Sequence, residues 1–416
     1  MAITELLNQT QRAARDLRIR PSAHRNEALR QIAQAIGDHR AAILAANQED
    51  MAAATHLSSA MQDRLRLTEA RVDGMVRAVN EVADQPDPLA GTRKIGEGRQ
   101  GIQVHRRRIP LGVIAIVYEA RPNVTAECAA LTLKSGNAVI LRGGKEALNS
   151  NKAVAAAVQT GLKQSDMPEA AVSLITDLDR AVVAELLGAV GQVDLIIPRG
   201  GARLMAMVDE HAKVPVIRHG EGICHLYVDA SADVPMAAAI AENAKVQRPG
   251  VCNTIETLLV HADKVVPLLA QLGPRLAELN VTLKADGRAR AALDAVGVRS
   301  EAAKPEDWDT EFLSLVLAIR TVDSLAQAMD HIDEHGTRHT AAIVADDESA
   351  AERFMTGVDA SCVLWNASTR FNDGGQLGLG AEMGISTSKM HAYGPMSAID
   401  LTAEKLVVYG EGQIRK

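Results

Sequence analysis

The residue best suited to covalent chemistry in this sequence is Cys252, in the segment QRPGVCNT (247–254). Pro249 and Gly250 predict a loop here, between a helical pattern and a strand-like run that starts at Ile255. A thiol on a loop at the edge of a sheet is accessible to a ligand, and a neighbouring arginine or amide can lower its pKa so that the thiolate acts as a nucleophile. The alternative is that Cys252 is a small buried hydrophobic residue, as free cysteines usually are.

Two glycine-containing turns are suited to holding phosphate groups. The segments LIIPRGGARLM (195–205) and LRGGKEA (141–147) each run from an apolar strand into a Gly-Gly pair. The first amides of a following helix point outward, and the helix dipole favours an anion there. Neither segment is the GxGxxG dinucleotide fingerprint, so an ordinary strand-to-helix turn remains the alternative for both. The candidate cofactor-binding residues are Arg142, Gly143, Lys145, Pro198, Arg199, Gly200 and Gly201.

The segment YEARPNVT (118–125) also follows an expected strand. Asn123 could donate its amide to a developing oxyanion, and Arg121 could receive a phosphate. The alternative is an X-Pro turn with Asn123 as a helix cap.

A late loop, residues 371–387, contains five glycines and an Asn-Asp pair. Glycine-rich loops are costly to order, and ordered ones usually approach a ligand or another backbone closely. A flexible surface loop is the alternative.

Composition limits the classes of function. The 416 residues are 47% hydrophobic and 23% charged, which indicates a folded globular chain of two or three domains. A net charge of -7 and 2% aromatic residues provide no general basic field and few stacking platforms, so we expect no nucleic-acid partner. The N-terminus lacks the apolar core of a signal peptide, and no apolar run is long enough to cross a bilayer, so we expect no membrane partner. Four widely spaced cysteines argue against a disulfide framework or a zinc site, and we expect a cytoplasmic protein without a metal.

The elements that must position these residues follow from the hydrophobic pattern. Apolar residues at helical spacing predict helices within residues 29–44 and 61–82. Residues 92–109 predict a projecting hairpin that would pair with another sheet. From Leu111 onward, apolar strands alternate with Ala-rich helices, which predicts parallel sheets covered on both faces. The expected strands are 112–119, 138–143, 172–176, 193–198, 214–220 and 225–229 in a first series, 254–261, 281–286, 312–319, 341–346 and 362–367 in a second, and 401–408 in the tail.

Several segments together resemble the gamma-glutamyl phosphate reductases, a family within the aldehyde dehydrogenase superfamily. They are YEARPNVTAE (118–127), RPGVCNTIETLLVH (248–261), HGTRHTAAI (335–343), NASTRFNDGGQLGLGAEMGIST (366–387) and EKLVVYGEGQIR (404–415). The order and spacing of these motifs are specific, and the resemblance covers essentially the whole chain.

The resemblance implies an α/β, aldehyde dehydrogenase-like fold with two doubly wound parallel-sheet domains and a β-hairpin oligomerisation arm. The implied division is a cofactor-binding domain of residues 1–91 and 111–225 with 367–390 returning to it, a catalytic domain of 226–366, and an arm of 92–110 and 396–416.

The resemblance also implies a reaction, the NADPH-dependent reduction of L-glutamyl 5-phosphate to L-glutamate 5-semialdehyde and phosphate in proline biosynthesis. The acyl group would pass through a thioester on Cys252, with oxyanion donors at Asn123 and the Cys252 amide. Arg121 would assist the departure of phosphate, and the two Gly-Gly turns would form the cofactor edge. Candidates for the amino-acid end of the substrate are Asn372, Asp373, Ser386 and Thr387.

One departure from the wider superfamily bears on the reaction. Aldehyde-oxidising members carry a Glu in a Leu-Glu-Leu-Gly-Gly motif, and this Glu activates water to hydrolyse the thioester. Here the matching segment IRHGEG (217–222) has Arg218 at that position, and Glu221 is a candidate for a displaced base. A reductase does not need this base. An NAD(P)-dependent aldehyde dehydrogenase that produces a free acid, and a non-catalytic nucleotide-binding protein of the same fold, remain as alternatives.

The expected partners are small molecules and further copies of the chain. Arg142 and Lys145 favour NADPH over NADH, since they would meet its extra phosphate. The arm is consistent with a homodimer and with a homotetramer. A glutamate 5-kinase that passes on the labile acyl phosphate is a further candidate partner.

Overall fold

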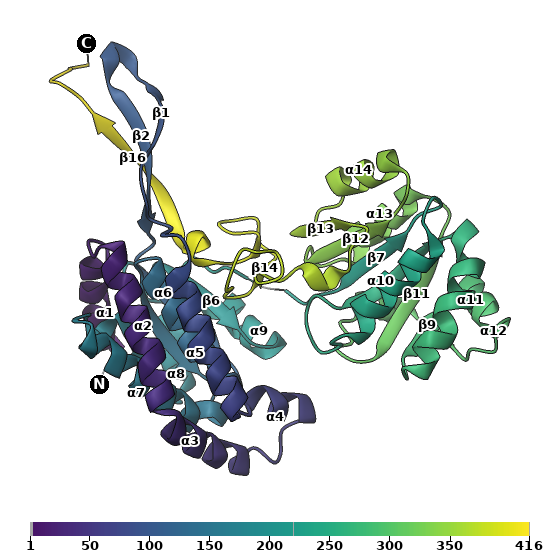
Figure 1. Cartoon of the computed structure of the whole chain (residues 1–416), viewed down its shortest axis with the longest axis horizontal. Coiled ribbons are helices and arrows are strands. Elements are labelled where there is room, and N and C mark those ends of the chain that lie inside the picture. Colours follow the sequence, from purple (N-terminus) through teal and green to yellow (C-terminus); the bar gives the residue numbers. More distant parts are fainter. Residues whose placement is uncertain (1–2, 219, 416) are drawn as a thin grey trace.

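The computed structural model describes residues 3–218 and 220–415, with no side-chain description at Ser59, Ala60 and Ala202. Figure 1 shows two α/β bodies and a thin three-stranded sheet that projects from the first of them. The expected fold class of two parallel-sheet domains plus a hairpin arm is therefore confirmed. Parts of three predictions lie outside the described residues, namely the outer ends of the ranges 1–91 and 396–416 and residue 219 of the expected strand 214–220.

The first sheet is parallel, with the strand order β5-β4-β3-β6. Its strands are β3 (Val113–Tyr118), β4 (Ala138–Gly143), β5 (Val172–Leu174) and β6 (Leu195–Arg199). The chain order reverses between β3 and β6, so the polar segments that follow Tyr118 and Arg199 meet at the carboxyl edge of this sheet.

Helices cover both faces of the first sheet, as its buried strands require. Right-handed crossovers place α6 (Asn123–Lys134) and α7 (Leu148–Gln164) on one face and α8 (Arg180–Leu187) on the other. The remaining helices of this body are α1 (Ile3–Leu17), α2 (Ser22–Asp38), α3 (Arg40–Ala53), α4 (Ser59–Leu65), α5 (Glu69–Asp84) and α9 (Ala202–His211).

The second sheet is also parallel, with the order β10-β9-β11-β8-β7-β12-β13. Separate clusters of buried aliphatic residues lie on its two faces, which fits a chain with few aromatic residues. Its strands are β7 (Cys224–Val228), β8 (Ile255–His261), β9 (Thr282–Ala285), β10 (Glu301–Ala302), β11 (Val316–Val322), β12 (Thr340–Val344) and β13 (Cys362–Trp365). Its helices are α10 (Val234–Val246), α11 (Ala262–Glu278), α12 (Gly287–Asp294), α13 (Leu325–His335) and α14 (Glu348–Gly357).

Three strand predictions need correction. The described part of 214–220 contains no strand, and only Val216 forms a bridge, to Ile196, because Pro215 has no N–H to donate. The strand expected from residue 312 begins at Val316, since Leu313 has a φ of 50° and turns the chain. The strand near 225–229, which the pattern grouped with the first series, is β7 of the second sheet.

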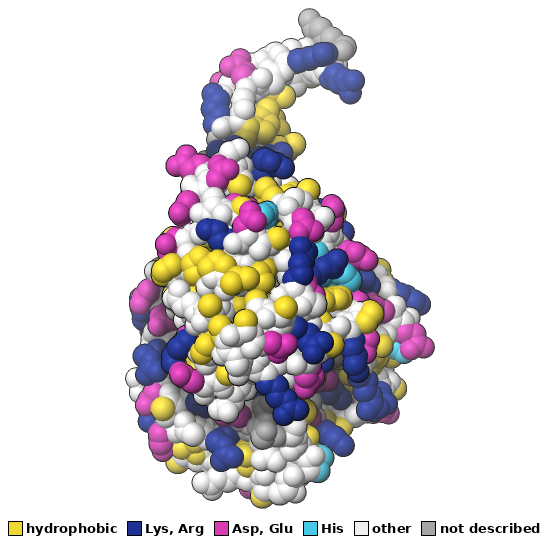
Figure 2. Space-filling model, turned by 90° about the vertical axis from the view of Figure 1, so that its right-hand side faces the viewer, with side chains coloured by type: hydrophobic (Ala, Val, Ile, Leu, Met, Phe, Trp, Pro, Cys, Tyr) yellow, Lys and Arg dark blue, Asp and Glu magenta, His cyan; other side chains and the backbone are white. Residues whose placement is uncertain are grey.

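The arm is an antiparallel sheet of β1 (Arg93–Glu97), β2 (Gln103–Pro110) and β16 (Thr402–Tyr409). Figure 2 shows basic and hydrophobic side chains close together on the projecting arm. Leu406, Val408 and Tyr409 of β16 are exposed there. Between β13 and β16, the chain crosses from the second body toward the arm and forms the short strands β14 (Ile385–Ser386) and β15 (Gly394–Pro395) (Figure 1). Among the described residues, no helix is both long and apolar enough to span a membrane.

Two histidines are buried together in the second body. The rings of His225 in β7 and His331 in α13 have centroids 5.3 Å apart, and Trp308 packs edge-on against His331. Burial lowers the pKa of His225 to about 4. Burial, together with the nearby His225 and Arg320, lowers the pKa of His331 to about 2. Both rings are therefore neutral in the folded protein at neutral pH.

We expect acid to destabilise the second body. Both folded-state pKa values lie below the ordinary value of 6.5. The contribution of the two neutral histidines to the free energy of unfolding is therefore complete above about pH 6.5 and is lost as the pH falls toward the folded-state pKa values. The free energy of unfolding should drop by about 1–2 kcal/mol per histidine between pH 7.5 and 5. Urea unfolding followed by tryptophan fluorescence measures this, since Trp308 and Trp365 both lie in this body. His331→Asn should make the pH dependence shallower, and an unchanged slope would contradict the assignment.

Candidate active site

The loop 247–254 joins α10 to β8 at the amino edge of the second sheet. Cys252 on this loop is exposed, whereas Cys128 and Cys224 are buried. The Cys224 thiol donates to the Cys252 carbonyl oxygen at 3.0 Å. Gly222 packs so closely that an added Cβ would lie 2.1 Å from the same oxygen. The backbone of Cys252 is thus fixed against the start of β7 while the residue stays accessible.

Buried polar side chains hold the residues that follow Cys252. Asn253 donates its amide to the Asn372 carbonyl at 2.9 Å, and Thr369 donates its hydroxyl to the Asn253 carbonyl at 2.7 Å. Thr254 donates its hydroxyl to the Arg248 carbonyl at 2.7 Å and closes the loop on itself. These hydrogen bonds therefore hold the Cys252 loop and residues 369–372 together.

A buried ion pair fixes the elements that flank this loop. The Lys245 ammonium at the end of α10 lies 2.6 Å from the Glu256 carboxylate in β8, and neither side chain is more than 1% exposed. Lys245 also donates to the Ile255 carbonyl at 2.9 Å, and Glu256 accepts from the Leu313 amide at 3.2 Å. Burial raises the pKa of Glu256 to about 7 and lowers that of Lys245, while each charge favours the ionised form of the other. Separation of the two ends of the loop would leave a buried charge without its partner.

The electrostatic surroundings of the thiol are divided. Although Cys252 is exposed as a residue, the protein atoms around its sulfur displace water and raise its pKa, and the carboxylates of Glu311 and Glu382 act in the same direction. The guanidinium groups of Arg199 and Arg121 oppose this and lower the pKa. The thiolate therefore depends on two arginines that come from the carboxyl edge of the first sheet.

Arg121 and Asn123, which follow β3, are placed differently. Arg121 is close enough to Cys252 for each to shift the pKa of the other. Asn123 is the first residue of α6, with Pro122 as the cap, and its amide donates to the Glu127 carboxylate at 2.9 Å. The Asn123 amide is therefore engaged with Glu127 in this structure, and Asn123 is not the helix cap that the sequence left open.

One expected cofactor turn binds a carboxylate oxygen, and the other supplies a carboxylate. The Gly201 amide, at the start of α9, donates to Glu119 at 2.9 Å. The Ala120 amide, which follows β3, donates to Glu146 of the turn after β4 at 2.6 Å. The chain after β3 and the turn after β6 therefore each have a main-chain amide that binds a carboxylate oxygen at this edge.

The side chains of this edge divide into structural and accessible ones. Arg142 donates to the Gly143 and Leu178 carbonyls, at 2.8 and 3.2 Å, while Lys145 is exposed. Gly143 is needed for packing, because a Cβ there would lie 2.0 Å from the Asn151 amide. Pro198 is buried within β6, and a Cβ on Gly200 would lie 2.7 Å from the Glu119 carboxyl carbon.

The crossing loop separates the four residues expected to bind the amino-acid end of the substrate. Asn372 is fully buried and donates its amide to the Thr340 hydroxyl at 2.8 Å. Asp373 is only half-buried. Ser386 is buried and donates to the Arg218 carbonyl at 3.4 Å. Thr387 accepts from the Gly220 amide at 3.1 Å, so both hydroxyls tie this loop to the linker before β7.

Two carboxylates near the thiol were not identified from the sequence. Glu311 accepts from the Gly222 amide at 2.9 Å, and Glu382 accepts from the Gly374 amide at 2.9 Å. Burial raises the pKa of both. Glu382 lies inside the glycine-rich loop and could have been singled out there, but Glu311 lies in no motif.

The residues at the hydrolytic-base position behave as surface residues. Arg218 forms an ion pair of 2.7 Å with Asp209 of α9, and both side chains are more than half exposed. Glu221 is exposed, and the neighbouring Gly222 amide bonds to Glu311 instead.

Comparison with known proteins places this geometry in a family. The aldehyde dehydrogenase family model matches residues 1–292. A gamma-glutamyl phosphate reductase of Xanthomonas campestris pv. campestris is 48% identical over 417 residues, covering 100% of both chains. One from Geobacter metallireducens is 48% identical over 398 residues, which covers 95% of this chain and 94% of that one. The crystal structure of a gamma-glutamyl phosphate reductase from Thermotoga maritima superposes with a TM-score of 0.96 at 38% identity over both full chains. An acetylating aldehyde dehydrogenase from Geobacillus thermoglucosidasius, covering 100% of this chain and 97% of that one, shares the fold at a TM-score of 0.70 and 18% identity.

We expect Gly222→Ala to displace the Cys252 backbone. The new Cβ would overlap the Cys252 carbonyl oxygen and carbon, which cannot yield as a flexible side chain can. A shift of about 1 Å in the nucleophile costs about 100-fold in kcat. Gly220→Ala is the matched control, because its Cβ would meet only the Thr387 hydroxyl at 3.4 Å. Steady-state kinetics and thermal unfolding of both variants test this, and equal kcat values would contradict it.

Proposed function

Because this chain belongs to the aldehyde dehydrogenase family and, within it, to the gamma-glutamyl phosphate reductases, we propose that it reduces L-glutamyl 5-phosphate through a thioester on Cys252. Its reaction belongs to proline biosynthesis, and its product is L-glutamate 5-semialdehyde. One observation carries the assignment of the nucleophile. Cys252 is an exposed thiol on a pinned loop, and guanidinium groups from the other body act on it.

The proposed chemistry begins with attack of the Cys252 thiolate on the acyl carbon. The carbon–oxygen bond to phosphate then breaks, its electron pair leaves with phosphate, and a thioester remains. When bound, the cofactor supplies the hydride that reduces this thioester. The carbon–sulfur bond then breaks and its electron pair returns to sulfur, which restores the thiolate and releases the aldehyde. No water is activated, and Arg218 at the hydrolytic-base position is consistent with this route.

The oxyanion would be held by the Cys252 amide and by Asn123. In this structure Asn123 donates to Glu127, so this role requires the amide to leave Glu127 when substrate binds. Glu127 also acts electrostatically on Arg121, so a single movement of this carboxylate would affect both groups.

Members of this family use NAD(P), and NADPH is our proposal for this chain. The carboxyl edge of the first sheet fits a phosphate-bearing cofactor, because the Gly201 amide at the start of α9 already binds an anionic oxygen. Lys145 is an exposed cation on the neighbouring turn, and Arg142 supports that turn through its carbonyl contacts. Glu119 would have to give up the Gly201 amide to the cofactor.

The other parts of the proposal concern the amino-acid end of the substrate and the assembly. Asp373 remains the candidate partner for the substrate ammonium, with Ser386 or Thr387 for its carboxylate. Association of copies through the exposed apolar side chains of β16, as a homodimer or homotetramer, is proposed from the arm. A cytoplasmic location and delivery of the acyl phosphate by a glutamate 5-kinase belong to the same proposal.

The reverse reaction tests the reaction class and the nucleophile together. Glutamate 5-semialdehyde, inorganic phosphate and NADP should yield NADPH, and Cys252→Ala should lower this rate by about 10⁴-fold or more, because the acyl group has no other site of attachment. NADPH absorbance is the measurement. Cys362→Ala is the control, because it removes a partly buried thiol elsewhere in the same sheet. Activity that survives Cys252→Ala would remove the nucleophile from the mechanism, and NADPH formation that ignores phosphate would indicate an aldehyde dehydrogenase that hydrolyses its thioester.

Asp373→Ala should raise the KM for glutamate 5-semialdehyde about tenfold, since the substrate ammonium would lose a charged partner. The KM for phosphate and the thermal stability should change little. Asn372→Ala is the contrasting variant, and it should lower the stability by about 1–3 kcal/mol because it removes the buried hydrogen bond from Asn372 to the Thr340 hydroxyl. An unchanged semialdehyde KM in Asp373→Ala would exclude this role.

A further inference from the structure

Three arginines from separate elements converge beside Cys252. Arg121 follows β3, Arg199 ends β6, and Arg64 lies in α4. The positive charges of both Arg199 and Arg64 act on Arg121, and Cys252 acts on it as well. The three guanidinium groups therefore share one region beside the thiol.

The first two arginines are brought together by the sheet. Tyr118 of β3 pairs with Arg199 of β6, and the Glu119 amide donates to the Arg199 carbonyl at 3.1 Å. Arg121 comes two residues later on the same edge. The Arg199 side chain packs on Gly384, where a Cβ would lie 1.9 Å from its Nη1. Its Nε is buried without a hydrogen-bond partner. A buried donor without a partner in the protein can bind a ligand or a water molecule.

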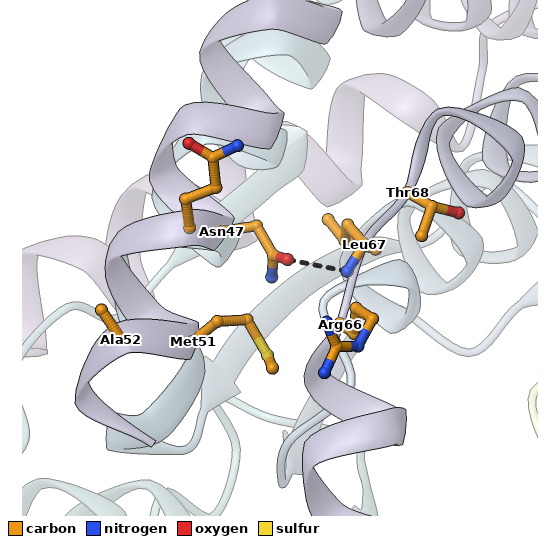
Figure 3. Close-up of a pocket in the computed structure, with 7 residues that line it drawn as sticks. Asn47, Met51, Ala52, Arg66, Leu67 and Thr68 are labelled. Atoms are coloured by element: carbon orange, nitrogen blue, oxygen red, sulfur yellow. Dashed lines mark hydrogen bonds between the residues drawn. The ribbon is translucent and has the colours of Figure 1, made fainter. Parts of the chain in front are cut away.

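Arg64 is positioned by a buried amide on the neighbouring helix. Asn47 of α3 donates to the Leu65 carbonyl at 2.8 Å and accepts from the Leu67 amide at 2.7 Å, so it grips the chain on both sides of the end of α4. Figure 3 shows the bond between Asn47 and Leu67 in the shallow pocket between these helices. The Arg64 Nη2 lies 3.5 Å from the Gly250 carbonyl oxygen, which places it against the Cys252 loop.

The three arginines differ from several other arginines of the first body, which form ion pairs. Arg71 pairs with Asp63, Arg40 with Asp73 and Glu69, and Arg218 with Asp209. Within residues 3–218 and 220–415, none of Arg64, Arg121 and Arg199 forms an ion pair. Burial lowers the pKa of Arg121 to about 10, and repulsion by Arg199 and Arg64 adds to this effect. The carboxylates of Glu127, Glu311 and Glu382 act on these arginines from beyond ion-pair distance. An anion that contacts the guanidinium groups directly would relieve the repulsion between them.

We propose that Arg64, Arg121 and Arg199 form the subsite for the phosphate group of the acyl phosphate. The inference rests on the proposed function and reassigns Arg199 from the cofactor to the substrate. Guanidinium groups match phosphate oxygens by paired N–H donors. When the thiolate attacks, the bond between the acyl carbon and the bridging oxygen breaks and its electron pair stays on phosphate. The three positive charges lie where this negative charge develops. Because Arg121 and Arg199 also favour the thiolate, bound phosphate and the thiolate compete for the same charges.

The test measures the KM for inorganic phosphate in the reverse reaction. Arg199→Gln and Arg64→Gln should each raise this KM about tenfold or more, with the KM for NADP and for glutamate 5-semialdehyde changed by less than about threefold. Arg30→Gln is the control, because this guanidinium is exposed and pairs with Asp84 of α5. If Arg199→Gln fails to fold, Arg199→Lys keeps the charge but loses the paired donors, and it should still raise the phosphate KM.

Alkylation of Cys252 by iodoacetamide gives a readout that needs no cofactor. Inorganic phosphate should slow alkylation of the wild-type protein and have several-fold less effect on Arg199→Gln. A raised KM for NADP with an unchanged KM for phosphate would overturn the proposal and return Arg199 to the cofactor. Wild-type NADPH formation without any need for phosphate would instead overturn the proposed function, and with it this subsite.

Discussion

The chemistry of this protein depends on holding a short loop rigid while leaving its thiol accessible. Buried side chains hold the Cys252 loop in place. Asn253 and Thr369 bond it to the crossing segment, and the pair of Lys245 and Glu256 fixes the helix before it and the strand after it. Breaking any of these contacts would leave a buried polar group or charge without a partner, which costs more than the contact itself contributes.

The candidate active site is assembled from residues at the edges of two sheets. The amino edge of the second sheet provides the thiol, and the carboxyl edge of the first provides Arg121 and Arg199. Desolvation raises the pKa of Cys252, Glu311 and Glu382 add to this effect, and Arg199 and Arg121 oppose it, so groups from different parts of the chain set this pKa together. In the proposed mechanism, an anion that joins the arginines would weaken their effect on the thiol.

Individual residues show how far the pattern of the sequence reaches. Cys252 and Arg121 were identified from a loop and a turn, because Pro and Gly mark those features locally. Asn372 also lies in a glycine-rich segment that the sequence marks as a ligand site, but only the structure shows that it is fully buried and that its amide bonds to the Thr340 hydroxyl. The sequence places Arg199 in a turn suited to phosphate. Only its contact with Gly384 and its effect on the pKa of Cys252 favour the substrate over the cofactor as its ligand.

The sequence by itself determined the alternation of buried strands and helices, the projecting hairpin and the position of a cysteine on a proline-glycine loop. These are local properties, set by the spacing of apolar residues and by the restricted backbone of proline and glycine. Only the tertiary structure decided that β7 joins the second sheet, that Glu311 lies beside the thiol, and that Arg64 reaches the loop from a helix near the N-terminus. The physical reason is that burial and electrostatic interaction depend on distance in space, and residues far apart along the chain carry no local pattern that records it.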